Sequence, residues 1–189
     1  AVTSVAFYPL GGYVLSSSLD GTVRIWEMAS GKCARICKGH KGAVTAVAVH
    51  PEGNSALSSG ADGTLRLWRC DKGKEIGKFT GHRGPVYCGI FNSGGAFVFS
   101  GGEDRNAVIW KTETQKPLVV LKGHTAAVRA LALSRDNATA VTGSTDWTVR
   151  TWNVDKAQVT HTFEIDESAI TGVALHPGGS YVLSGNSRG

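Results

Sequence analysis

The hydrophobic pattern in the second quarter of the chain predicts four short β-strands. Apolar and β-branched residues fill the run 44–49, and the runs 55–60, 64–69 and 75–79 follow it between turns, with no competing period of 3.6 residues. Turn-forming residues separate the runs at 51–54, 62–63 and 71–73. The Asp-Gly pair in the middle turn is typical of a tight hairpin, so we expect neighbouring runs to pair as antiparallel strands.

The same pattern returns every 42 residues along the chain. Tryptophan holds one column of the repeat, at Trp26, Trp68, Trp110 and Trp152. Aspartate holds another, at Asp20, Asp62, Asp104 and Asp146. A Gly-His pair recurs at 39–40, 81–82 and 123–124, and a hydroxyl residue at Ser16, Ser58, Ser100, Thr142 and Ser184. Several columns with one period and no insertion predict a β-propeller, in which each unit of four strands is one blade.

These columns resemble those of the WD-repeat family of β-propellers over the whole chain. The dipeptide that names the family is absent, and the tryptophans are followed by Glu27, Arg69, Lys111 and Asn153. The resemblance implies an all-β fold of four-stranded antiparallel blades, which we expect to be part of a seven-bladed ring. The chain then forms one incomplete propeller domain, 1–189, with blades at about 2–42, 43–84, 85–126 and 127–168 and a partial blade at 169–189.

Seven units of 42 residues need 294 residues, more than the 189 present. An open array would leave strand edges and apolar blade faces in water, which proteins avoid. We favour the interpretation that the sequence is a stretch of a longer chain. The alternatives are that another chain completes the ring, or that the chain forms a small irregular assembly.

The resemblance also implies a hydrogen-bonded series of His, Ser or Thr, Asp and Trp in each blade. The columns place these residues at His40, Ser58, Asp62 and Trp68, at His82, Ser100, Asp104 and Trp110, and at His124, Thr142, Asp146 and Trp152. A catalytic Ser-His-Asp set is needed once, whereas a bracing network is needed in every blade. We therefore interpret these residues as structural, and we predict a protein that is not an enzyme and has no cofactor or metal.

The fifth unit departs from this pattern. Asp166 stands in the histidine column, and Arg188 stands in the aspartate column. One hypothesis is that the pair has reversed polarity, with Asp166 accepting hydrogen bonds from Arg188. The other is that this blade has lost its network and both side chains are solvated.

A candidate protein-binding site lies in blades three and four. In WD-repeat propellers, binding tends to use the face with the loops before each inner strand and the turns between the second and third strands. Most residues in these columns are small, and the large ones are Tyr87, Glu103, Arg105, Arg129 and Trp147. Arg105 and Trp147 replace the glycine that follows the aspartate in other units, and Tyr, Trp and Arg dominate interface energetics. The alternative is ordinary drift at surface positions, with Trp147 folded back on its own blade.

Charge and hydropathy restrict the partner. Twenty basic and 15 acidic residues leave a formal charge of +5, and the basic residues are scattered. Arg24, Arg66 and Arg150 repeat on the third strand, so we interpret them as blade architecture, and nucleic-acid binding is the least favoured function. No apolar run approaches the roughly 20 residues that cross a bilayer, so we expect no membrane insertion.

The cysteines indicate a reducing compartment. Cys33 and Cys37 would lie on one strand about 13 Å apart, too far for a disulfide. We interpret these and the other two cysteines, Cys70 and Cys88, as small buried apolar residues, which predicts an intracellular location, cytoplasmic or nuclear.

We predict a non-catalytic scaffold for protein–protein interaction that displays a loop face to a peptide or domain of another protein. The alternative is a structural subunit of a large permanent assembly, which contacts its partners through blade sides and edges.

Overall fold

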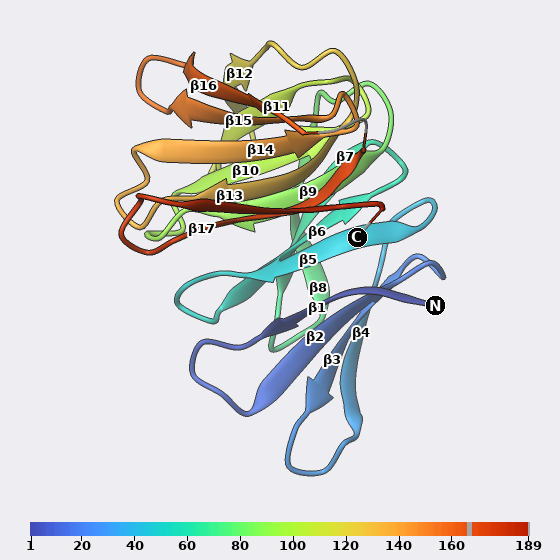
Figure 1. Cartoon of the computed structure of the whole chain (residues 1–189). Helices are drawn as coiled ribbons and strands as arrows, with labels where there is room; N and C mark the ends of the chain where they lie inside the picture. Colours follow the sequence, from blue (N-terminus) through green and yellow to red (C-terminus); the bar gives the residue numbers. More distant parts are fainter. Residues whose placement is uncertain (166–167, 189) are drawn as a thin grey trace.

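The computed structural model describes residues 1–165 and 168–188, which form five antiparallel sheets (Figure 1). The first two sheets contain β1 (Val2–Phe7), β2 (Tyr13–Ser18), β3 (Thr22–Glu27) and β4 (Cys33–Lys38), then β5 (Val44–Val49), β6 (Ser55–Gly60), β7 (Thr64–Arg69) and β8 (Lys74–Thr80). The next two contain β9 (Val86–Phe91), β10 (Phe97–Gly102), β11 (Ala107–Lys111) and β12 (Pro117–Leu121), then β13 (Val128–Leu133), β14 (Thr139–Ser144), β15 (Thr148–Asn153) and β16 (Gln158–Glu164). The last contains β17 (Ile170–Leu175) and β18 (Val182–Asn186).

The strand order within each sheet follows the sequence, so every sheet is a simple up-and-down meander. β5, β6 and β7 occupy the runs predicted from the sequence, and β8 extends its run by one residue at each end. The all-β fold of four-stranded antiparallel blades is therefore confirmed, while the seven-bladed ring remains a prediction.

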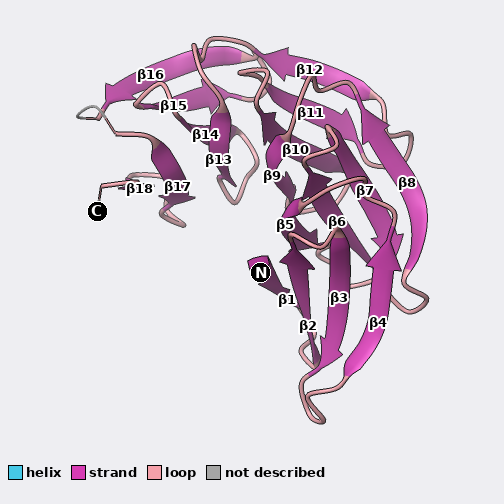
Figure 2. Ribbon diagram, turned by 90° about the vertical axis from the view of Figure 1, so that its right-hand side faces the viewer, coloured by secondary structure: helices cyan, strands magenta, loops and turns pink. Residues whose placement is uncertain are grey.

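The blades follow one another in an arc, with the first strand of each on the concave side and the fourth on the convex side (Figure 2). Blade one and the pair β17–β18 stand at the two ends of this arc. We call the face with the second-to-third-strand turns and the loops into each inner strand the top face. The opposite face, with the other two turns of each blade, is the bottom face.

Four separate cores form in the described residues, three between consecutive four-stranded blades and one between blade four and the pair β17–β18. Trp68 of blade two is 1% exposed and packs against Leu15, Val23 and Ile25 of blade one. Trp110 takes the same place against Leu57, Leu65 and Phe79 of blade two. Trp152 does so against blade three. Because each tryptophan covers the sheet before it, the stability of a blade depends on its neighbour.

The ends of the arc show what a missing neighbour does to equivalent side chains. Val47 is 8% exposed against blade one, whereas Val5, one unit earlier, is 60% exposed. Leu57 is 1% exposed beneath blade three, whereas Leu183, three units later, is 73% exposed. Burial therefore depends on the adjacent blade and not on the residue's place in its own sheet.

These two leucines give a matched test of packing between blades. Leu57→Ala should lower the free energy of unfolding of the 189-residue chain by about 2–5 kcal/mol, because the cavity it leaves is enclosed. Leu183→Ala removes the same atoms from a side chain that water already reaches and should change stability by less than about 0.5 kcal/mol. Urea unfolding of both variants makes the comparison, and equal losses would contradict packing between blades as the source of stability.

Candidate protein-binding face

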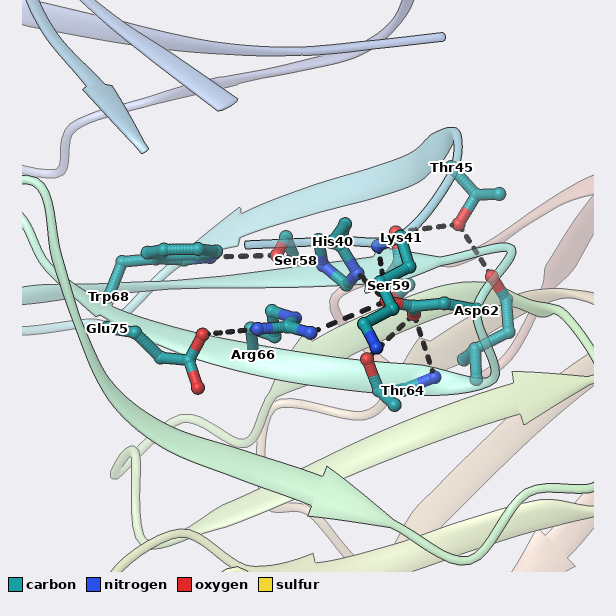
Figure 3. Close-up of polar contacts among 11 residues, drawn as sticks. His40, Lys41, Thr45, Ser58, Ser59, Asp62, Thr64, Arg66, Trp68 and Glu75 are labelled. Atoms are coloured by element: carbon teal, nitrogen blue, oxygen red, sulfur yellow. Dashed lines mark hydrogen bonds and ion pairs between the residues drawn. The ribbon is translucent and has the colours of Figure 1, made fainter. Parts of the chain in front are cut away.

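A chain of hydrogen bonds links the four repeated polar residues in each of blades two, three and four. In blade two, Trp68 Nε1 lies 2.8 Å from Ser58 Oγ, which lies 2.7 Å from His40 Nε2, and His40 Nδ1 lies 3.0 Å from an Asp62 oxygen (Figure 3). Blade three repeats these distances within 0.1 Å from Trp110 to Asp104. In blade four the corresponding distances are 2.8, 2.7 and 2.8 Å, from Trp152 to Asp146.

Only one direction of donation satisfies this chain. An indole N–H can only donate, so the hydroxyl oxygen accepts it and gives its own hydrogen to histidine Nε2. The histidine then carries its hydrogen on Nδ1 and donates to the carboxylate. A catalytic Ser-His-Asp set has the same order of donation, but here each hydroxyl also accepts the indole N–H, and Ser58, Ser100 and Thr142 are 0% exposed, so no substrate reaches them.

The charge states in blade four agree with this direction. Burial lowers the pKa of His124 more than the bond to Asp146 raises it, so the imidazole is neutral at pH 7. Burial alone would raise the pKa of Asp146, but bonds from Thr148, from the Thr125 N–H and from His124 hold it at about 2. The same balance keeps Asp62 of blade two ionised, with a pKa below its usual range.

The aspartate of each chain fixes the top face. Asp62 also accepts hydrogen bonds from the Lys41 N–H, at 2.9 Å, and from Thr64 Oγ1, at 2.7 Å (Figure 3). Lys41 belongs to the loop before β5 and Thr64 begins β7, so one buried carboxylate ties two top-face segments together. Arg66 adds an ion pair to Asp62 and another to Glu75.

A β-bulge opens every inner strand at the same position. Val44 pairs with Gly60 and Ala46 with Ser59, so Thr45 between them has no partner. The other inner strands skip Thr3, Tyr87, Arg129 and Thr171 in the same way. Because a bulge re-aims its side chain, this column projects differently from the rest of the strand. From this position, the Thr45 hydroxyl donates a hydrogen bond to the Val86 carbonyl of the next blade, at 2.6 Å.

Three of the five candidate residues meet at these bulges. The Arg129 guanidinium lies 3.9 Å from the centroid of the Tyr87 ring, and the Tyr87 hydroxyl donates to Glu103 at 2.5 Å. Burial and the bond to Glu103 raise the pKa of Tyr87, so the phenol stays protonated and donates. In blades three and four, this aromatic and charged cluster stands where blades one and two have a threonine hydroxyl.

Arg105 and Trp147 both keep the backbone of the glycine they replace. Their φ angles are 70° and 67°, close to 81° at Gly21 and 77° at Gly63. Residues other than glycine rarely adopt this left-handed backbone region, which costs each of them about 1–2 kcal/mol. Both side chains are exposed, Trp147 by 48%. Among the described residues, no hydrogen bond or ring contact joins Trp147 to the other four candidates.

A cavity of about 690 Å³ lies beside Glu103 and Arg105 at the top of blade three. The residues that line this cavity include Asp104. The cavity was not predicted from the sequence. The signal was available in the 42-residue columns, because Val108 stands where the other three complete blades have Arg24, Arg66 and Arg150.

The hypothesis of a reversed pair in the fifth unit is not tested, because Asp166 lies outside the described residues. The Arg188 N–H donates to Asn186 Oδ1 at 3.0 Å.

Within residues 1–165 and 168–188, no three histidine, cysteine or acidic side chains are placed to hold a metal ion. In the same part of the chain, no helix is long and apolar enough to cross a membrane.

Comparison with protein families assigns the chain. The WD40 family model, described as WD domain, G-beta repeat, matches residues 1–27, 31–69, 73–111, 115–153 and 157–189. The chain therefore belongs to the WD40 repeat family, whose domains are commonly non-catalytic scaffolds for protein interaction. Comparison with curated proteins gave no match.

The buried histidines predict a pH dependence of stability. Because the folded-state pKa values of His40 and His124 lie below the usual 6.5, the unfolded chain binds protons more readily in this range. Stability should be constant above pH 7, fall as the pH drops below about 6.5, and fall again below about 4 as Asp146 is protonated. Melting temperatures from pH 8 to 3 measure this.

The left-handed turns predict a stability gain from glycine. Arg105→Gly and Trp147→Gly should each stabilise the chain by about 1 kcal/mol, because glycine adopts these φ angles without strain. The reverse change, Gly63→Arg in blade two, should destabilise it by about as much. Chemical denaturation of the three variants checks the signs, and a loss on Arg105→Gly would mean that the arginine's contacts outweigh its backbone strain.

Proposed function

We propose that the chain is a non-catalytic scaffold that docks a peptide or domain of another protein on the top face of blades three and four. The single observation that carries this is the backbone of Arg105 and Trp147, which hold large exposed side chains at the left-handed φ angles that Gly21 and Gly63 have in blades one and two. Strain of this kind clusters at functional sites. The cluster of Tyr87, Glu103 and Arg129 on the same face supports the proposal.

The site suits protein recognition because its supports are rigid. The network carboxylates hold the turns of Arg105 and Trp147 in place, since the Asn106 and Thr148 N–H groups donate to Asp104 and Asp146. A partner that docks here orders little of the scaffold, so less binding free energy is lost to ordering. Aromatic and guanidinium groups supply the contact energy.

The repetition of the polar chain in three blades supports a non-catalytic role, because the His, hydroxyl and Asp groups are used in bracing. Free thiols at all four cysteines are compatible with an intracellular location, cytoplasmic or nuclear, which remains part of the proposal.

The alternative function is that of a structural subunit in a large permanent assembly. The exposed apolar side chains of Ile36, Ile76 and Leu118 on the outer strands β4, β8 and β12 support it, because they offer blade edges for contact. A partner held in this way would not depend on the top face.

A pulldown from extract of the source cells tests the proposal. The Arg129→Glu, Trp147→Ala double variant should lose a defined set of bound proteins, because it reverses one charge and removes the exposed indole. The matched control is Lys72→Glu with Met28→Ala, which makes the same kinds of change at exposed bottom-face residues. Both variants must first show the melting temperature of the parent chain.

Partners that survive the top-face variant and are lost with substitutions at Ile76 and Leu118 would overturn the proposal in favour of the structural subunit. Binding that falls steeply with salt and is removed by nuclease would instead indicate a nucleic-acid partner.

A further inference from the structure

Blade three lacks an ion pair that its neighbour has. In blade two, Arg66 on the third strand lies 3.5 Å from Asp62 and also pairs with Glu75 (Figure 3). One unit later these positions hold Val108 and Pro117. Among the described residues, no arginine forms an ion pair with Asp104, the counterpart of Asp62.

The space that an arginine fills elsewhere holds no cation in blade three. A Cβ built on Gly39 would lie 2.8 Å from an Arg66 nitrogen, and one on Gly123 would lie 2.6 Å from an Arg150 nitrogen. A Cβ built on Gly81, the equivalent in blade three, would have only Trp110 atoms within 4 Å. The side chains of Arg83, Arg105 and Lys122 therefore do not come within 4 Å of this position.

Asp104 also keeps acceptor capacity that Asp62 has used. Both carboxylates accept from a histidine and from two backbone N–H groups. Asp62 accepts in addition from Thr64 Oγ1 and forms an ion pair with Arg66, whereas the threonine's counterpart in blade three is Asn106, which donates only through its backbone. A carboxylate has about four lone-pair sites, so Asp104 can accept at least one further bond.

The vacant place opens to solvent through the cavity at the top of blade three. Gly81, Asp104 and Val120 line it, and the Asp104 side chain is 11% exposed. Three cations, Arg83, Arg105 and Lys122, also line the cavity and are themselves exposed. No ion pair neutralises these three among the described residues.

We propose that this cavity binds an arginine side chain of a partner protein, presented next to an acidic residue. The partner's guanidinium takes the place that Arg66 has in blade two and donates to Asp104, while its neighbouring carboxylate meets Arg83, Arg105 and Lys122. Guanidinium is preferred to ammonium because its planar fork presents several donors in fixed directions, as Arg66 does when it meets Asp62 with one nitrogen and Glu75 with another. This inference rests on the proposed function and names the chemistry of the docked segment.

The probe is a capped five-residue peptide with one arginine followed by one glutamate. Titrated into the ¹⁵N-labelled chain, it should shift the amide signals of Arg83 and Asn106, whose N–H groups bond to Asp104. Replacing the peptide arginine with citrulline, which is neutral and of similar shape, should weaken binding at least about tenfold. Equal binding of the citrulline peptide would overturn the proposal, as would tighter binding of a peptide with two glutamates and no arginine.

A substitution in the chain provides the matched control. Val108→Arg restores the arginine of the other blades, fills the vacant place from within and should abolish the shifts, whereas Val108→Leu should preserve them. Unchanged binding to a folded Val108→Arg chain contradicts the inference. If that variant does not fold, the comparison of arginine and citrulline peptides on the parent chain still decides.

The exposed cations have their own test. Arg83→Glu should weaken binding of the arginine–glutamate peptide, because the peptide glutamate then meets a reversed charge. It should leave unchanged the binding of a peptide with glutamine in place of glutamate. A larger loss of binding for the glutamine peptide than for the glutamate peptide would rule out an acidic residue beside the partner's arginine. If these peptides fail to bind but the pulldown still depends on Arg129 and Trp147, the scaffold function stands and only its arginine chemistry is wrong.

Discussion

A buried indole N–H must find an acceptor, and in this chain the acceptor is a hydroxyl that begins a chain of bonds ending at an ionised aspartate. Hydrogen bonds along this chain can be donated in only one direction. The aspartate at its end also accepts from the Lys41 N–H of the top-face loop and from the Thr64 N–H of the strand that follows the turn. The tryptophan at its other end covers the core of the preceding blade. One polar chain therefore couples packing between blades to the geometry of the surface loops.

Because the network holds the loops, the residues within them can vary without loss of the fold. The variation is concentrated in blades three and four. Threonine at the bulge becomes Tyr87 and Arg129, and the turn glycine becomes Arg105 and Trp147, with the left-handed backbone retained. The third-strand arginine becomes Val108, which leaves Asp104 with spare acceptor capacity. These changes place aromatic, cationic and acceptor groups together on one sector of a repetitive scaffold.

The proposed function is that this sector of the WD40 repeat chain recognises a polypeptide by combined charge and shape. The exposed Trp147 indole and the Arg129 guanidinium stacked on Tyr87 provide contact area. The cavity of blade three adds a partly buried carboxylate beneath a cationic rim. Apolar sites such as Leu183 at the ends of the arc are a separate kind of surface, created by the lack of an adjacent blade and not by a change of residue type.

The sequence by itself determined the blades, their strands and the members of each polar network, because a 42-residue period aligns chemically equivalent positions. It also marked the five large top-face residues as departures from that period. Only the tertiary structure decided that Tyr87, Glu103 and Arg129 touch, that Trp147 stays apart, and that the absence of an arginine at Val108 leaves a cavity beside Asp104. Periodicity reports which residues are equivalent, whereas contacts across blades depend on bulges, backbone angles and side-chain packing between segments about 20 or 42 residues apart.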